Sequence, residues 1–442
     1  MIALISARSE NSDGHDSLFR LFAIGQLSLI LVTWPLWIPQ TDFPQIPLVS
    51  IAGRLPTIVE WGLIGSLLAT LAAIILLAKS RGRRIAAVCT GSSTALLVCI
   101  DQHRLQPWVW QFILISLILA MADANVARSS WRWLVIGIYI WSAWSKIDYG
   151  FSLGHGPFLL DGLFKAIGWE QGTRLWPGGT RTVVAELIPV AEMSIGIGLS
   201  IARIRRWALA GSIFMHGGLL LALGPLGHQH QAGVLVWNIF FIIQNWLLFF
   251  RATQPIAISR IDEFVDDAHR LSNESSTDGN CMRHVRLSGR ASVGNLLAKT
   301  VIIVAMSWPL LEPLGLCDHW LAWAVYAAKP ERVTLWLDAA DVMKLPPSLQ
   351  PYLEMPTEAG DDDMFRMDRW SLDVLRVPIY PQDRFQVGVA LSLVRKFRLD
   401  RPRLVIEGQA DRWTGKRVIR EYEGFASIQK LADAFRLGVE PR

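Results

Sequence analysis

The stretch that decides the fold runs from Trp131 to Asp148 and reads WRWLVIGIYIWSAWSKID. Apart from Arg132, its charged residues lie at its C-terminal end, and the residues between are almost all apolar. A helix of this length is close to the roughly 30 Å needed to cross a bilayer. Tryptophans near both ends are typical of helices that end at a membrane–water interface. We therefore interpret the stretch as a membrane-spanning helix.

The composition of the whole chain favours the same class of protein. Of the 442 residues, 52% are hydrophobic and 18% are charged, whereas soluble domains contain about 25% charged residues. The net charge of +5 is modest and no basic stripe is present, so no nucleic-acid partner is expected. None of the 4 cysteines forms a Cys-x-x-Cys motif. His228 and His230 are weak evidence for metal binding, and no metal site is predicted.

Eight further apolar runs have a similar length, so the sequence predicts an all-α polytopic membrane bundle of about nine transmembrane helices, with the lipid bilayer as its main partner. The boundaries are soft by a few residues. The predicted spans are Leu18–Trp37, Thr57–Lys79, Arg84–Ile100, Pro107–Ala122, Trp131–Asp148, Val183–Arg203, Arg206–Leu226, Gln231–Phe250 and Leu296–Leu316.

The loops between these spans differ in charge. Short loops on the side of the N-terminus are rich in lysine and arginine, as in Lys79–Arg84 and Arg203–Arg206, whereas the opposite loop Gly224–Gln231 has neither. Cytoplasmic loops carry such an excess of basic residues. We therefore predict a multi-pass protein of the cell inner (plasma) membrane, with a cytoplasmic N-terminus. Nine spans then place the C-terminus outside the cytoplasm.

The last third of the chain has a different pattern. Residues 251–295 include a run of Ser, Asn and Asp and are predicted to form a flexible cytoplasmic connector. Residues 296–316 form the ninth span. In residues 317–442, Arg332–Leu337 alternates like a strand, Gln382–Lys396 has the pattern of an amphipathic helix, and Thr414-Gly415 marks a hairpin turn. This part is predicted to be a small extracytoplasmic α+β domain.

Residues 1–126 and 127–250 contain similar short motifs in the same order. Pro56–Gly65 resembles Pro189–Gly196, and two further pairs of motifs follow. The order is typical of two parallel four-helix units. Glu60 precedes Arg83 by 23 residues and Glu192 precedes Arg205 by 13. Because these spacings differ, the sequence leaves open whether the two halves arose by duplication.

Polar residues gather near the extracytoplasmic ends of the spans. An ionisable group inside a bilayer costs a few kcal/mol, so its presence calls for a partner or a use. Glu192, His216 and Asn238 each lie roughly 10–15 Å from that end, given a rise of 1.5 Å per residue. The pattern predicts an outward-facing polar pocket. The candidate ligand-binding residues are Lys146, Glu186, Glu192, His216, Asn238, Asp101 and Arg104.

Structural explanations compete with this hypothesis at several positions. A salt bridge between Asp101 and Arg104 would simply close a helical hairpin. Lys146 at a helix end could extend to the interface, or pair with Glu186 or Glu192. His216 could hydrogen-bond a neighbouring helix.

Residues 127–250 resemble the DoxX/MauE group of four-helix membrane proteins. The resemblance rests on Trp144-Ser145-Lys146 and on Ile188-Pro189-Val190-Ala191-Glu192, and the sequence has Ser142 and Ala143 where the group usually has a glycine. It implies a redox-associated module, often linked to quinones or thiol chemistry. The cofactor stays unknown at this point, with a quinone-like lipid as the candidate. The chain also resembles, more loosely, the transmembrane domain of vitamin K-dependent carboxylase-like proteins. This resemblance rests on a lysine at a helix end among tryptophan-rich spans.

The sequence leaves four functions open, of which transport is the weakest because no span is visibly broken by a mid-helix glycine–proline pair. The first is a redox-associated protein, or one that binds a lipophilic, quinone-like ligand in the polar pocket. The alternative is a membrane-anchored structural protein whose C-terminal domain binds an extracytoplasmic protein partner. The third is a membrane enzyme in which Glu192 and His216 form an acid–base pair, which requires the two side chains to lie within hydrogen-bonding reach or to share one water.

Overall fold

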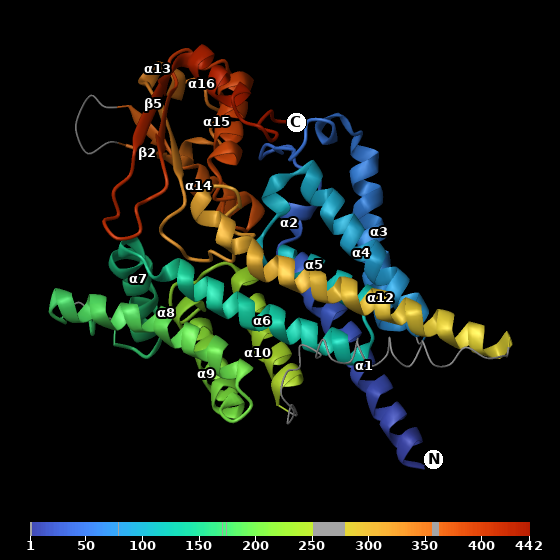
Figure 1. Ribbon diagram of the computed structural model, residues 1–442. Coiled ribbons are helices and arrows are strands. Elements are labelled where there is room, and N and C mark those ends of the chain that lie inside the picture. The colour runs from blue at the N-terminus through green and yellow to red at the C-terminus, as the bar shows by residue number, and fades with distance from the viewer. Residues whose placement is uncertain (1, 78, 170, 174, 251–278, 356–361) are drawn as a thin grey trace.

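The computed structural model describes residues 2–442 except 78, 170, 174, 251–278 and 356–361. The chain is 66% helical. Long helices form one body, and a small sheet with its own helices lies at one end of it (Figure 1). The N-terminal end of the first helix, α1 (Ile2–Val32), points away from the sheet (Figure 1). A helical body with a small C-terminal α+β region is the architecture that the sequence predicts.

In the first part of the helical body, the second, third and fourth predicted spans match helices closely, whereas the first helix begins before the predicted Leu18 and ends at Val32. Pro107 occupies the first turn of its helix, where a missing N–H is harmless. Asp101 ends the preceding helix and its Oδ1 accepts a hydrogen bond from the His103 amide at 3.1 Å. The elements are α1 (Ile2–Val32), α2 (Trp34–Trp37), η1 (Ala52–Arg54), α3 (Thr57–Leu76), α4 (Ser80–Ile100), η2 (Gln102–Arg104) and α5 (Pro107–Met121).

The second part departs from prediction at two places. The Asp123 side chain caps a helix through the Val126 amide at 3.1 Å, so that helix starts at Ala124, before the predicted Trp131. The segment after Asp148, predicted as a loop, forms a π-helix and an α-helix. The elements are α6 (Ala124–Lys146), η3 (Phe151–His155), α7 (Gly156–Ala166), α8 (Gly178–Ser200), α9 (Arg205–Leu223) and α10 (Ala232–Phe249).

The last long helix, α12 (Gly279–Ser307), begins inside the stretch predicted as a flexible connector. The remainder of that stretch, 251–278, lies outside the described residues. The α-helix ends before Pro309, which lacks an amide hydrogen, and continues as the 3₁₀ helix η4 (Trp308–Leu314). Because α12 packs against α5 and α6, and α1 contacts α3 and α10, the two predicted four-helix units form one body.

Within the described residues, seven helices are long and apolar enough to cross a membrane. Of the nine predicted spans, α5 is shorter, at 15 residues, and α6 is not among the seven. The charged residues of α6, Arg128, Arg132 and Lys146, lower its hydropathy. The seven are Gly14–Val32, Thr57–Leu76, Ser80–Ile100, Gly179–Ser200, Arg205–Leu223, Ala232–Phe249 and Val293–Leu314.

The C-terminal region contains an antiparallel sheet with strand order β2-β3-β1-β4-β5. Alternate residues of the central strands are buried, as a half-covered sheet requires, and Gly415 makes the predicted turn with φ of +67°. The strands are β1 (Arg332–Leu337), β2 (Leu353–Glu354), β3 (Asp363–Phe365), β4 (Arg403–Glu407) and β5 (Ile419–Glu423). The helical elements are α13 (Ala339–Val342), η5 (Gln350–Tyr352), α14 (Met367–Leu375), α15 (Asp383–Phe397) and α16 (Gly424–Asp433).

This region is fixed to the helical body by polar and aromatic contacts. The ring of His103, between α4 and α5, contacts the Pro378 carbonyl and Ser371 Oγ, each at 3.1 Å. Burial lowers the pKa of His103 to about 4, so the imidazole is neutral. The ring of Phe43 packs against Trp370 of α14, with the ring centroids 4.6 Å apart and the planes tilted by 45°. The domain is therefore docked on the body and is not held by a linker alone.

Candidate functional site

The centre of the candidate site is an ion pair between α6 and α8. Lys146 Nζ lies 2.8 Å from Glu192 Oε2 and donates to Ser142 Oγ at 2.6 Å. Only 7% of the Lys146 side chain and 11% of the Glu192 side chain are exposed. Lys146 is the last residue of α6 and its ammonium turns toward α8, so of the alternatives that the sequence left open for Lys146 the structure has the pairing with Glu192.

A second set of hydrogen bonds links α6, α9 and α10. Tyr139 OH lies 2.6 Å from His216 Nε2, and His216 Nδ1 lies 2.7 Å from Asn238 Oδ1. Asn245 Nδ2 donates to Tyr139 OH at 2.7 Å, and to Ser212 Oγ at 3.3 Å. All five side chains are buried. The predicted proximity of His216 and Asn238 is confirmed.

The ion pair and this network are neighbours. Tyr139, Ser142 and Lys146 are spaced i, i+3 and i+7 on α6, so they lie along one face of the helix. Lys146 is close enough to interact electrostatically with the His216 ring, and Glu192 is close enough to interact electrostatically with the Tyr139 hydroxyl. We call Lys146, Glu192 and Ser142 the Lys146 cluster, and the five residues of the preceding paragraph the His216 network. Together they bring three buried ionisable side chains and an imidazole to one place.

The acid–base pair considered for a membrane enzyme is not formed. The Glu192 carboxylate pairs with Lys146, while the two ring nitrogens of His216 contact Tyr139 and Asn238. The direct hydrogen bond between Glu192 and His216 that this hypothesis allows is therefore absent among the described contacts, and each side chain has its own set of partners.

Glu186 has a different partner from the one considered in the sequence. Its carboxylate accepts a hydrogen bond from Ser152 Oγ, in the π-helix η3. π-helical turns occur frequently at functional sites, and the neighbouring His155 has a buried Nδ1 with no partner among the described groups. Lys146 also acts electrostatically on His155. Glu186 therefore lies on the border of the site and does not pair with Lys146.

Asp101 and Arg104 belong to another cluster. Arg104 pairs with Glu60 instead of Asp101, and it donates to the Leu36 carbonyl at 3.1 Å and to the Trp37 carbonyl at 3.2 Å. The second oxygen of Glu60 pairs with Arg442 at 2.8 Å. The predicted Asp101–Arg104 bridge across the hairpin is therefore not the main contact of either residue.

We call Glu60, Arg104, Gln45 and Arg442 the Glu60 cluster. Gln45 Nε2 completes it by donating to Glu60 Oε1 at 2.7 Å. Asp101 instead accepts backbone hydrogen bonds, and burial raises its pKa to about 6. Neither Asp101 nor Arg104 contacts the Lys146 cluster, so these two residues are not part of the candidate site.

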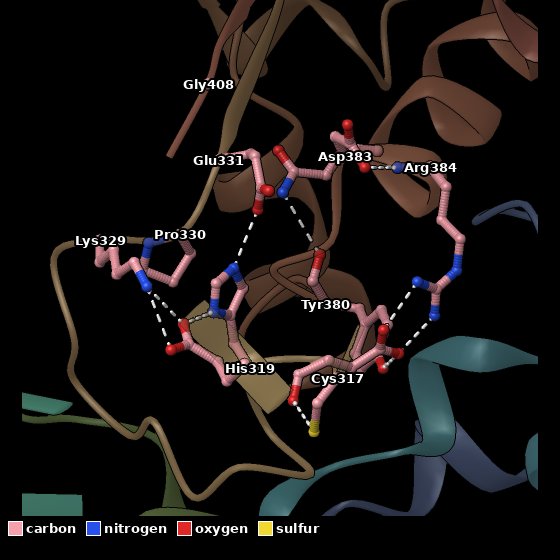
Figure 2. Close-up of polar contacts among 12 residues, drawn as sticks. Cys317, His319, Lys329, Pro330, Glu331, Tyr380, Asp383, Arg384 and Gly408 are labelled. Atoms are coloured by element: carbon pink, nitrogen blue, oxygen red, sulfur yellow. Dashed lines mark hydrogen bonds and ion pairs between the residues drawn. The ribbon is translucent and has the colours of Figure 1, made fainter. Parts of the chain in front are cut away.

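A third buried cluster lies where η4 joins the C-terminal domain, and the sequence did not indicate it. His319 lies between Glu312 and Glu331, each at 2.9 Å (Figure 2). Burial alone would lower the pKa of His319, but the two carboxylates raise it to about 9. Arg384 Nη1 donates to Asp318 Oδ1 at 2.8 Å beside it. These bonds anchor the domain; among the described residues, no group of three or more His, Cys, Asp and Glu could hold a metal ion.

Sequence reasoning missed Tyr139, Ser142, Ser212 and Asn245. Their signal was helical spacing from predicted residues: Tyr139 and Ser142 precede Lys146 by seven and four positions, and Asn245 follows Asn238 by seven. Hydroxyl and amide groups cost little inside a helix, so a search for charged residues passes over them.

Comparison with known proteins gives no further guide. No protein-family model, no curated protein and no solved structure matches this chain.

Proposed function

We propose that this chain is an integral membrane protein that binds a lipophilic, quinone-like ligand through the Lys146 cluster and the His216 network. The observation that carries the proposal is the buried Lys146–Glu192 pair beside the five hydrogen-bonded side chains of the His216 network. Ionisable groups at such positions in a bilayer are costly and are usually kept for a use. The proposed bundle is redox-associated and DoxX/MauE-like in residues 127–250.

The surface of the helices supports the membrane placement. Large apolar side chains point outward from several helices: Leu76 is 81% exposed, Trp207 81% and Phe214 84%. Lipid is the environment in which outward-facing side chains of this kind would be covered. Lipid would remove this surface from water at a gain of roughly 25 cal/mol per Å².

The proposed topology has nine crossings, with α5 and α6 added to the seven longer helices. The N-terminal end of α1 and the C-terminal domain lie at opposite ends of the body (Figure 1), as an odd number of crossings requires. The excess of basic residues then makes the N-terminus cytoplasmic and the C-terminal domain extracytoplasmic.

Cysteine labelling tests this topology. Met355 is 84% exposed on the domain, so Met355→Cys should react with a membrane-impermeant maleimide on intact cells, above the background of the parent protein. Labelling that appears only after the membrane is permeabilised would place the domain inside.

The donors and acceptors of the site match a carbonyl- or hydroxyl-bearing ligand. Of the three acceptors of the Lys146 ammonium, the Ser142 carbonyl is the most distant, at 3.3 Å, so this hydrogen bond is the one that a ligand oxygen would replace. Asn245 Oδ1 is buried and has no partner among the described groups, and it can accept from a hydroxyl. This is the set of groups that a quinone and a quinol would use.

Mass spectrometry of small molecules retained by the detergent-extracted protein tests the proposal. The wild-type protein should carry a quinone-like lipid, and Glu192→Gln should lose it. Asp161→Asn is a matched control, because Asp161 also pairs with a cation, Arg181, but at 32% side-chain exposure. Equal ligand content in the wild type and Glu192→Gln would end the proposal.

The alternative, an extracytoplasmic partner of the domain, is favoured by one observation. β5 is an edge strand, and Ile419 and the adjacent Val418 are 61% and 71% exposed. Exposed edges can pair with a strand of another protein. Cross-linking from Ile419→Cys should then retrieve one protein in defined stoichiometry, unchanged by Glu192→Gln. A featureless set of cross-links would count against it.

A further inference from the structure

A second site lies on the other face of α6. A cavity of about 410 Å³ is bounded by α6, η4 and the β4–β5 connection. Its walls are mainly apolar and include Ile140, Trp141, Pro309 and Leu310. Leu310 is 61% exposed and Trp144, also in the wall, is 45% exposed. The cavity therefore opens sideways at the outer surface of the bundle.

One cation, Arg412, stands in this wall. Its guanidinium lies 4.5 Å from the centre of the Trp144 ring, where a cation–π contact holds it. Among the residues that the structure describes, Arg412 forms no ion pair. Asp148 interacts with it electrostatically, but from beyond ion-pair distance. The other charged wall residue, Glu312, is neutralised by His319 at 2.9 Å and Lys329 at 3.1 Å.

The position of Arg412 is fixed before any ligand arrives. The β4–β5 connection extends from the sheet to the end of α6 and the start of α7 (Figure 1). The Tyr149 amide donates to the Arg412 carbonyl at 2.8 Å. Asp411 Oδ1 accepts from the Thr414 amide at 2.8 Å and closes the turn. Arg412 is thus a preorganised cation, which lowers the entropy lost on binding.

The cavity extends, along the direction of the helices, across the depth at which the proposed membrane spans end. Ile140 lies six residues before Lys146, the end of α6, which is about 9 Å along the helix. The candidate span of α12 and η4 ends at Leu314, and Arg412 belongs to the domain beyond it. The lower part of the cavity is therefore at the depth of acyl chains, and its cation is at the depth of headgroups.

We propose that this cavity binds one acidic phospholipid, with an acyl chain along Ile140 and Leu310 and its phosphate on Arg412. Arginine suits a phosphate because its planar fork can donate two hydrogen bonds at once. The inference rests on the proposed membrane placement, but it does not depend on what binds at Lys146. The phospholipid would hold the domain against the end of α6.

Native mass spectrometry of the full chain from nanodiscs of equal phosphatidylglycerol and phosphatidylcholine tests the proposal. The wild type should retain one phosphatidylglycerol, preferred about fivefold over phosphatidylcholine. Arg412→Gln should abolish the preference and Arg412→Lys should keep part of it. Leu310→Trp, which fills the cavity, should lose the lipid although Arg412 remains.

Arg403→Gln is the matched control, because Arg403 also lies over a tryptophan, Trp336, at 5.2 Å, but on the sheet; it should retain the preference. Glu192→Gln should retain it too, which separates this site from the proposed quinone-like site. The proposal is overturned if Arg412→Gln keeps the wild-type preference, or if the wild type shows none. Complete displacement of the lipid by glycerol phosphate would also overturn it, since the acyl chain would then contribute nothing.

Discussion

The Glu60 cluster and the Lys146 cluster have the same chemistry but different surroundings. Each pairs a buried carboxylate with a cation near the end of the helical body that carries the C-terminal domain. Glu60 is 1% exposed and has two arginines and Gln45 as partners. Glu192 is 11% exposed, has Lys146, and lies beside the His216 network. The Glu60–Arg104 pair is almost completely enclosed and has a second arginine on its carboxylate, which indicates a structural role. The Lys146–Glu192 pair is slightly more exposed, and it is the pair at which we propose a ligand.

The largest expected effect comes from Glu60→Gln. It leaves Arg104 buried without a counter-charge, and breaking a buried pair in this way costs about 3–5 kcal/mol. Glu192→Gln should cost less, because a lysine can release its proton and an arginine does not. The comparison is made by denaturant unfolding of both variants in one detergent. Equal losses of stability would remove the distinction between the clusters.

The next largest effect is a pH dependence at His319, whose neighbour Glu312 lines the cavity beside α6. The pKa is raised from 6.5 to about 9 in the folded protein, so the protonated form stabilises the fold. This stability is complete below about pH 6.5 and is lost as the pH rises through about 9, roughly 3 kcal/mol in all. His319→Gln should flatten the unfolding free energy over this range. An unchanged pH profile in the variant would contradict the assignment.

A smaller effect is expected for Arg442→Gln. Arg442 donates to Glu60 at 2.8 Å and to the Leu55 carbonyl at 2.6 Å, so the C-terminal segment is part of the enclosure of the Glu60 cluster. Losing hydrogen bonds to a charged group costs about 2 kcal/mol. Thermal unfolding should show this loss, while ligand retention at the Lys146 cluster should not change. If Arg442→Gln lost the ligand but kept the wild-type stability, the result would contradict the structural role of Arg442.

The smallest effect is expected for Gly415→Ala. Gly415 has a positive φ of +67°, and an added Cβ would lie 2.6 Å from the Tyr149 ring. The stability cost is about 1 kcal/mol, but the turn carrying Arg412 must shift. The preference for phosphatidylglycerol should therefore fall while the quinone-like ligand stays. Retention of both, with the expected small change in stability, would show that the turn does not position Arg412.

The sequence predicted the parts of the fold that depend on local patterns. Apolar runs located most of the long helices, alternation located β1, and the turn at Thr414-Gly415 located the hairpin of β4 and β5. It missed η3 and α7, because a segment between Asp148 and Thr182 with few long apolar runs reads as a loop until tertiary contacts bury Leu159 and Leu160. It also placed α12 too late, because a polar helix extension has no apolar signal.

The site was predicted in part for the same physical reason. The cost of burying charge identified Lys146, Glu192 and His216 without knowledge of their partners. The partner of Arg104 could not be predicted in this way, since Glu60 and Arg104 lie 44 residues apart. Nor could Arg442, whose contact with Glu60 depends on how the domain docks.

The most direct test of the account is photo-cross-linking of the full chain in membranes with a photoreactive lipophilic quinone, followed by peptide mapping. We expect the label on α6, α8, α9 or α10 near Lys146 and His216, and we expect Glu192→Gln to reduce it while Asp161→Asn does not. A label spread evenly over outward-facing helices such as α3, and unaffected by Glu192→Gln, would contradict the central claim.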